Sequence, residues 1–238
     1  MKLLYRVGVA VVVGCLVATV QATGASAEQT PGAGADGAGL DAAKQALTAR
    51  IDGRLAELSA LSATLTAAKQ LTSGHRATLT TVVTGDQAGL KQLRTKVAAE
   101  ATAAAVKADA AEMINGYRVY LLAAPQVRLT ISADLETAAA ARLAPVADQL
   151  AKAIDKAKQG GKDTSKAEAA LVDLRSQLAT ANSTIAGRAD TLLAVRPGPD
   201  AAAISAKVDA TRAAIKSTRA SLRAAVADAK TIRSVLGG

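Results

Sequence analysis

The chain has 238 residues and a net charge of +9, because 29 lysines and arginines outnumber 20 aspartates and glutamates. Half of its residues are hydrophobic, but alanine alone makes up about a quarter of the chain, and there is no Trp or Phe and only three Tyr. One Cys and one His exclude a disulfide framework and a zinc site with several His or Cys ligands.

Residues 1–27 have the three parts of a secretory signal peptide. Lys2 and Arg6 form a short basic region, an apolar run follows, and Ala25-Ser26-Ala27 matches an A-x-A cleavage site. The apolar run of about 14 residues is shorter than the roughly 20 residues that a membrane-spanning helix needs. We therefore expect cleavage after Ala27 and a product that is secreted or held in the cell envelope.

The single cysteine, Cys15, lies inside this leader, where Gly14-Cys15 resembles a lipobox. A lipoprotein anchored at Cys15 is the alternative to cleavage after Ala27. It is the less favoured prediction, because the apolar residues 16–20 would follow the anchor, where a polar tether is expected. Cleavage after Ala27 would leave a chain with no Cys, and therefore no disulfide.

Residues 28–40 are rich in Gly and Ala and lack hydrophobic periodicity, which predicts a flexible tether. Gly32, Gly34 and Gly37 have the spacing of a dinucleotide-binding fingerprint. No strand precedes them, so we interpret the match as accidental and expect no cofactor.

Residues 41–238 predict a single helical bundle domain. Apolar residues recur at spacings of three and four to about Leu71, which predicts a first long helix capped by Asp41. Ser73 is placed to cap a second helix, whose middle is weakened by Gly85 and Gly89.

Pro125 suits the first turn of a third helix, because its missing N–H costs nothing there. This helix should end at Gly160 and be kinked or restarted at Pro145. Ser165 and Glu168 have the spacing of a capping box that opens a fourth helix.

The fourth helix is expected to carry a heptad seam, and Asp200 is placed to cap a last helix that runs to about Leu236. The heptad residues are Leu171, Leu178, Ile185 and Leu192. These patterns predict an all-α fold: an elongated antiparallel bundle of four to five long helices with coiled-coil-like seams. The alternative is an extended coiled coil or an oligomer that shares its seams, so self-association stays open.

The stretch from Met113 to Arg128 holds large side chains in an otherwise alanine-rich chain, which predicts the densest part of the core. Tyr117 and Tyr120 would share one face of a helix. Their apolar neighbours favour a core role over stacking on a ligand.

His75 is the only histidine, and its place near a helix start favours an exposed or capping role. We expect no metal site, since a zinc ion would need three or four ligands. A Ser–His–Asp arrangement through His75 is not ruled out by the sequence, but no nucleophile motif points to one. The chain is therefore expected not to be an enzyme.

The last helix carries a row of basic residues beside its apolar seam. The row consists of Arg212, Lys216, Arg219, Arg223 and Lys230. The favoured interpretation is a solvated bundle face, in which long cationic side chains flank the core. The alternative is contact with an anionic polymer of the envelope or a phospholipid surface. Nucleic acid fits poorly, because export removes the chromosome and few aromatics are present to stack on bases.

Two runs of sequence, 117–127 (YRVYLLAAPQV) and 154–165 (IDKAKQGGKDTS), carry a resemblance to a known group of proteins. The resemblance extends from about Leu40 to Gly238. The chain resembles a group of exported, alanine-rich helical proteins of actinobacteria and some other bacteria. The resemblance implies secretion and a helical bundle, and it brings no assigned activity. We expect a non-catalytic exported protein with a structural or binding role in the cell envelope or extracellular space.

Overall fold

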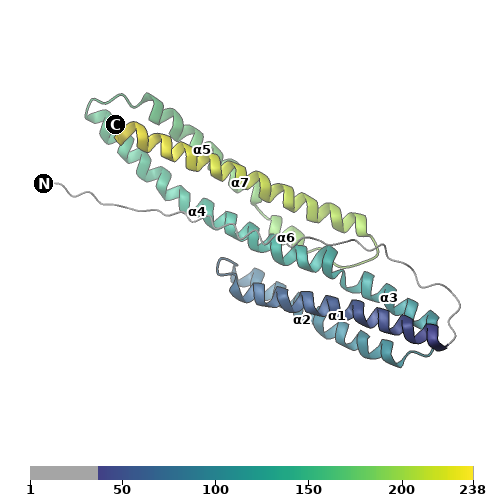
Figure 1. The fold of residues 1–238 in the computed structure, drawn as a ribbon. Coiled ribbons are helices and arrows are strands. Elements are labelled where there is room, and N and C mark those ends of the chain that lie inside the picture. The colour runs from purple at the N-terminus through teal and green to yellow at the C-terminus, as the bar shows by residue number, and fades with distance from the viewer. Residues whose placement is uncertain (1–36, 238) are drawn as a thin grey trace. The chain divides into compact units, whose positions relative to one another are not determined.

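The computed structural model describes residues 37–237, which belong to one compact unit of helices (Figure 1). The described helices, in chain order, are α1 (Gly37–Ala67), α2 (Ser73–Ala99), α3 (Ala103–Tyr117), the π-helical turn η1 (Val119–Ala123), α4 (Ala124–Gln159), α5 (Ser165–Ile185), α6 (Arg188–Leu193) and α7 (Ala201–Gly237). No strand occurs among these residues, so the prediction of an all-α bundle is confirmed. The predicted signal peptide, Cys15 and most of the predicted tether lie outside the described residues.

Helices α1 and α2 form an antiparallel hairpin that α3 covers. The Nζ of Lys44, near the start of α1, donates to the carbonyl of Ala98 at the end of α2, 3.2 Å away, as antiparallel pairing requires. The predicted apolar stripe of α1 is buried at Leu47, Ile51, Leu58, Leu61 and Leu65. The 3.6-residue period of the sequence therefore gives one buried face per helix.

Helices α4, α5 and α7 pack side by side, and the pairing of α5 with α7 is the most extensive in the described residues (Figure 1). The Nζ of Lys162, in the turn between α4 and α5, donates to the carbonyl of Leu236 near the end of α7. The start of α5 thus lies beside the end of α7, so these two helices are antiparallel. No helix among residues 37–237 is long and apolar enough to cross a membrane.

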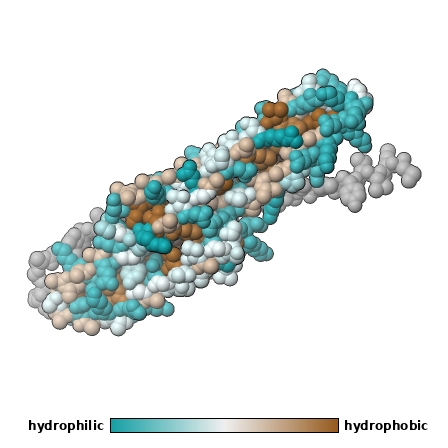
Figure 2. Space-filling model, turned by 180° about the vertical axis from the view of Figure 1, so that it is seen from behind, coloured by the Kyte–Doolittle hydropathy of each residue, from teal (hydrophilic) through white to brown (hydrophobic). Residues whose placement is uncertain are grey.

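Buried apolar residues form two large clusters and one small one. The first cluster joins α1, α2 and α3 with the first turns of α4, up to Val127. The second joins α5 and α7 with the later part of α4, from Ala140 to Ile154. A small third cluster joins Ala133 of α4 with Ile185, Ala189 and Ile215, which lie in α5, α6 and α7. Helix α4 therefore contributes to all three. On the face shown in Figure 2, apolar side chains reach the surface in patches that hydrophilic ones interrupt.

Several predicted helix starts were displaced. Helix α1 begins at Gly37, so the helix already includes the last four residues of the predicted tether, and Asp41 lies within its first turns instead of capping it. Thr72, not Ser73, caps α2, since its hydroxyl accepts from the N–H of His75.

The predicted capping box of α5 is also wrong. Thr164 is the residue before the helix, its hydroxyl donates to Glu168, and Ser165 bonds Asp163 instead. By contrast, the cap of α7 is confirmed, because Asp200 Oδ1 accepts from the N–H of Ala203 at 2.9 Å.

The restart that Pro145 was predicted to cause does not occur, and a break that was not predicted occurs at Gly187. Helix α4 runs through Pro145 without restarting, and it starts with Pro125 in its first turn as predicted. The predicted fourth helix is interrupted at Gly187, which has a φ of +64° and separates α5 from α6. The heptad residues remain buried, but the seam does not continue in one helix past Ile185.

The central stretch is only partly core. Met113 and Leu122 are buried, Tyr117 is half-buried, and Tyr120 is 54% exposed with the Arg54 guanidinium 5.3 Å above its ring. The prediction of a core role for Tyr120 is therefore wrong. The two tyrosines do not share a helix face, because Arg118 adopts a left-handed conformation with a φ of 44° and ends α3 between them.

Candidate binding crevice

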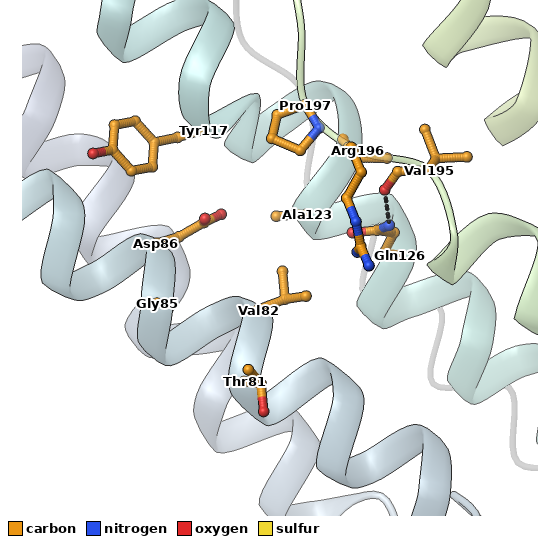
Figure 3. Close-up of a pocket in the computed structure, with 11 residues that line it drawn as sticks. Thr81, Val82, Gly85, Asp86, Tyr117, Ala123, Gln126, Val195, Arg196 and Pro197 are labelled. Carbon is orange, nitrogen blue, oxygen red and sulfur yellow. Dashed lines mark hydrogen bonds between the residues drawn. The ribbon is translucent and has the colours of Figure 1, made fainter.

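A crevice of about 180 Å³ lies where α2 meets the junction of α3 and α4 and the segment between α6 and α7 (Figure 3). Three parts of the chain that are distant in sequence form its walls. The lining residues are Thr81, Val82, Gly85, Asp86, Tyr117, Leu122, Ala123, Gln126, Val195, Arg196 and Pro197.

Asp86 supplies an acidic group on the α2 wall. Its side chain extends from α2 into the crevice (Figure 3), and it has no hydrogen bond or ion pair within the described residues. Burial raises the pKa of the Asp86 carboxyl from its usual 3.8 to about 6. Desolvation of an unpaired carboxylate disfavours its charged form. Keeping Asp86 ionised at neutral pH therefore lowers the stability of the fold.

Tyr117, from the last turn of α3, lies beside this wall because α2 has no side chain at Gly89. A Cβ at Gly89 would lie 2.5 Å from the Tyr117 hydroxyl oxygen and 2.6 Å from its Cε1. Burial raises the pKa of Tyr117, and the negative charges of Glu112 and Asp86 raise it further. The neutral hydroxyl therefore persists well into the alkaline range.

Gln126 fixes the opposite wall. It is 2% exposed, and its Nε2 donates to the carbonyls of Leu192 and Val195 at 2.9 and 3.1 Å, the second bond being dashed in Figure 3. Because both amide hydrogens are used, the orientation of the carboxamide is set. No hydrogen bond from the described residues to its oxygen accompanies these two.

Arg118 holds the remainder of the segment between α6 and α7. Its Nε donates to the carbonyl of Gly198 at 2.8 Å, and its Nη2 donates to the carbonyl of Pro199 and to Asn115 Oδ1. Three side-chain hydrogen bonds thus hold Arg118 in its strained left-handed backbone conformation. The segment that carries Arg196 is therefore positioned at both ends.

Arg196 supplies the only cation that lines the crevice. It is exposed, and its one hydrogen bond among the described residues is a long one, 3.4 Å, to the carbonyl of Leu193. It forms no ion pair with Asp86, so the two opposite charges face the crevice separately (Figure 3). The hydroxyl of Thr81, also at the wall, already donates to the carbonyl of Ala77 at 3.0 Å.

A second hollow, of about 270 Å³, lies between α1 and α2 and is lined largely by hydroxyls and by Arg76. The guanidinium of Arg76 donates to the carbonyls of Leu65 and Ala68. It therefore satisfies carbonyls that the end of α1 leaves without helical partners. The cation of this hollow is used to hold the fold together.

His75 is neither exposed nor a helix cap, contrary to the sequence-based expectation. Its Nδ1 lies 2.8 Å from Asp134 Oδ1 and its Nε2 lies 3.1 Å from Asp190 Oδ1, so the imidazole joins α2, α4 and α6. Burial lowers the pKa of His75, but the hydrogen bonds and charges of the two aspartates outweigh it and raise the pKa above 6.5. No group of three or more metal-ligating side chains occurs among residues 37–237.

The basic row of α7 is divided by the structure. Arg219 is half-buried, and its Nε donates to Glu136 Oε1 of α4 at 2.8 Å, while Arg212 pairs with Asp209 one turn earlier. The remaining members, Lys216, Arg223 and Lys230, are exposed and form no ion pair within the described part of the chain. Of the basic row, only these three offer surface cations that form no ion pair with the residues described by the structure.

No protein-family model matches the chain, and no similar protein was found among curated sequences or solved structures. The crevice therefore has to be interpreted from its own geometry.

Sequence reasoning did not identify Asp86, Gln126 or Arg196. The two glycines in the middle of α2 were a signal, since Gly85 and Gly89 border the crevice and the Tyr117 ring. Gln126 lies in the stretch that was singled out for its large side chains. However, the two carbonyls to which it donates belong to Leu192 and Val195, which are 66 and 69 positions further along the chain.

Proposed function

We propose that this chain is a non-catalytic exported helical protein with a structural or binding role in the cell envelope or extracellular space. The leader pattern of residues 1–27 and the resemblance to exported helical proteins support export. The long packed helices support a structural or binding role.

The observation that best supports a non-catalytic role is the environment of His75. Both of its ring nitrogens face carboxylates, Asp134 on one side and Asp190 on the other. An imidazole held in this way is favoured in its doubly protonated form, in which both nitrogens are donors. It then has no lone pair with which to take a proton from a nucleophile, as a Ser–His–Asp mechanism would require.

Export is tested by expressing the full chain with a C-terminal tag in a bacterial host that secretes it. We expect the tagged protein outside the cytoplasmic membrane, with Glu28 as its first residue by N-terminal sequencing. A lipidated N-terminus at Cys15, or retention in the cytoplasm with an intact Met1, would contradict the proposal.

A second candidate function is docking on an anionic surface, and the three unpaired cations of α7 favour it. Lys216, Arg223 and Lys230 follow one another at intervals of seven residues, about 10 Å along the helix, and so share a face. Each basic residue near an anionic membrane contributes about 1 kcal/mol of attraction. Three together would suffice for reversible, salt-sensitive binding.

This candidate is tested by co-sedimentation with vesicles of phosphatidylglycerol and phosphatidylcholine at low salt. Changing Lys216, Arg223 and Lys230 to Gln is expected to weaken partitioning by about a hundredfold, because three contributions of about 1 kcal/mol are lost. Arg219 is kept, since Glu136 depends on it. The matched control changes Lys69, Lys91 and Lys107, three exposed lysines of the α1–α3 region, to Gln. Equal losses of partitioning in both variants would show that only net charge matters, and they would refute the proposal of a specific binding face on α7.

A further inference from the structure

We propose that the crevice between α2, the α3–α4 junction and the α6–α7 segment binds a small zwitterion, with its protonated amine at Asp86 and its acidic group at Arg196. Such binding is independent of export and of the cations on α7. It would give the chain a small-molecule ligand in addition to any surface contact.

The amine end of the ligand is defined by Asp86, an acceptor that the protein leaves unused. The Asp86 carboxylate extends into the crevice with no donor among the described residues (Figure 3). An ammonium group has three donors and no acceptor, so it matches the two oxygens of a carboxylate. A neutral or anionic group at this end would leave Asp86 uncompensated.

The middle of the ligand should be aliphatic. Val82, Leu122 and Ala123 line the crevice between the two charged ends, and Leu122 and Ala123 are 2% and 1% exposed. Tyr117 and Pro197 lie at its sides (Figure 3). Apolar walls with a few placed polar groups are typical of small-ligand sites.

The acidic end is set by Arg196. This side chain is exposed at the wall opposite Asp86 and forms no ion pair with any described carboxylate. Asp86 and Arg196 do not reach each other, so a molecule that carries both charges can neutralise both at once. A guanidinium binds a carboxylate through two parallel hydrogen bonds, which favours a carboxylate over other acceptors.

A ligand-binding site in this crevice would explain two features of α2 that lower the stability of the helix, Gly85 and the desolvated Asp86. A Cβ at Gly85 would meet no atom within 4 Å, so packing does not require glycine there. Glycine in a helix interior costs up to about 1 kcal/mol relative to alanine. Desolvation of Asp86 adds to this cost. A glycine and an unpaired acid give the crevice an open, acidic wall that suits ligand binding. Neither residue would be favoured in a helix that served packing alone.

The proposal is tested with 4-aminobutanoate, 5-aminopentanoate and 6-aminohexanoate as zwitterionic probes, and with butylamine and butanoate as singly charged ones. Binding to the mature chain at pH 7.5 is followed by amide chemical shifts in NMR. At least one zwitterion should bind with a dissociation constant on the order of 10 mM or tighter, with shifts centred on residues 81–86 and 195–197. Butylamine and butanoate should bind at least about tenfold more weakly, because each leaves one charged wall unpaired.

Variants make the test specific. Asp86→Asn and Arg196→Gln should each weaken zwitterion binding about tenfold or more, since each removes one charge pair. Gly85→Leu should abolish it by filling the crevice, while unchanged shifts elsewhere report that the fold is intact. The charge-matched controls are Asp41→Asn and Arg142→Gln, at exposed sites outside the crevice. Absence of binding by every probe, equal binding of butylamine and a zwitterion, or equal losses in the control variants would overturn the proposal.

Discussion

Gly89 of α2 lies against the ring of Tyr117 of α3, so closely that a Cβ at position 89 would be 2.5 Å from the tyrosine hydroxyl oxygen. An alanine normally stabilises a helix interior by up to about 1 kcal/mol relative to glycine. Here the ring has to move, and overpacking costs about 1–3 kcal/mol. Gly89→Ala should therefore lower the free energy of unfolding by about 1–2 kcal/mol, as measured by urea denaturation.

The matched control is Gly85→Ala, one turn earlier in α2, where a Cβ would meet no atom within 4 Å. It should be neutral or stabilising by up to about 1 kcal/mol. Combining Gly89→Ala with Tyr117→Ala should cost less than the sum of the two single changes. A stabilised Gly89→Ala variant would show that Tyr117 does not occupy this place.

His75 predicts a pH dependence of stability with a definite sign. Its pKa in the folded chain is raised, because the hydrogen bonds to Asp134 and Asp190 outweigh the burial that lowers it. A raised folded pKa means that the contribution to stability is complete below the unfolded pKa of about 6.5 and is lost as pH rises through the folded value. The melting temperature should therefore fall between pH 6 and pH 9.

His75→Gln isolates this effect, since Gln keeps hydrogen-bonding capacity and has no titration. The variant should be less stable than the native chain at pH 6, and the difference should shrink toward pH 9. Asp190→Asn should reduce the same slope while leaving the Asp134 contact in place. A native chain whose stability relative to His75→Gln is constant over this range would contradict the assignment.

Asp86 predicts a separate pH effect at lower pH. Burial raises the pKa of its carboxyl from 3.8 to about 6, so the folded state favours the protonated form. Stability is therefore lost as pH rises from about 4 through 6, and the cost persists above this window. Asp86→Asn should stabilise the chain by about 1–3 kcal/mol at pH 8, because one pKa unit corresponds to about 1.4 kcal/mol.

At pH 4 the same substitution should have little effect, since the native carboxyl is then largely protonated. Thermal melts of both proteins at the two pH values measure the difference. Asp41→Asn, at an exposed position, should change neither melt. A destabilising Asp86→Asn at pH 8 would show that the carboxylate has a cationic partner.

Arg219 and Lys216 are neighbours in the basic row, but their removal should have different costs. Arg219 donates to Glu136, whose side chain is 9% exposed, whereas Lys216 is exposed and unpaired among the described residues. Arg219→Gln leaves a buried carboxylate without its charged partner and should cost about 1–3 kcal/mol. Lys216→Gln should stay within about 0.5 kcal/mol of the native stability. Urea denaturation compares the two, and equal costs would contradict the buried pairing.

Local patterns were sufficient to predict most of the fold. The apolar stripes of α1 and α2, the start of α4 at Pro125 and the cap at Asp200 all depend on neighbours within a few residues. The break at Gly187 was missed because Leu192 keeps the heptad in register and remains buried beyond it.

The candidate sites were not accessible to the same reasoning. His75 meets carboxylates 59 and 115 positions away, and no local pattern indicates such contacts. The basic row was found by its angular position, but periodicity cannot tell Arg219, paired with Glu136, from the exposed Lys216. Tyr120 was misplaced because the left-handed Arg118 turns the chain within what looked like continuous helix.

The participation of α4 in all three apolar clusters bears on how the described part of the chain opens. Amides of α1 and α2 are protected by the first cluster, and those of α5 and α7 mainly by the second. Native-state hydrogen exchange reports such groups as separate cooperative units when they open independently. Helix α4 takes part in both groups, through Val127 in the first cluster and through the residues from Ala140 to Ile154 in the second. Its amides should therefore exchange last, only when both groups of helices have come apart, and α4 would be the slowest-exchanging core of the molecule.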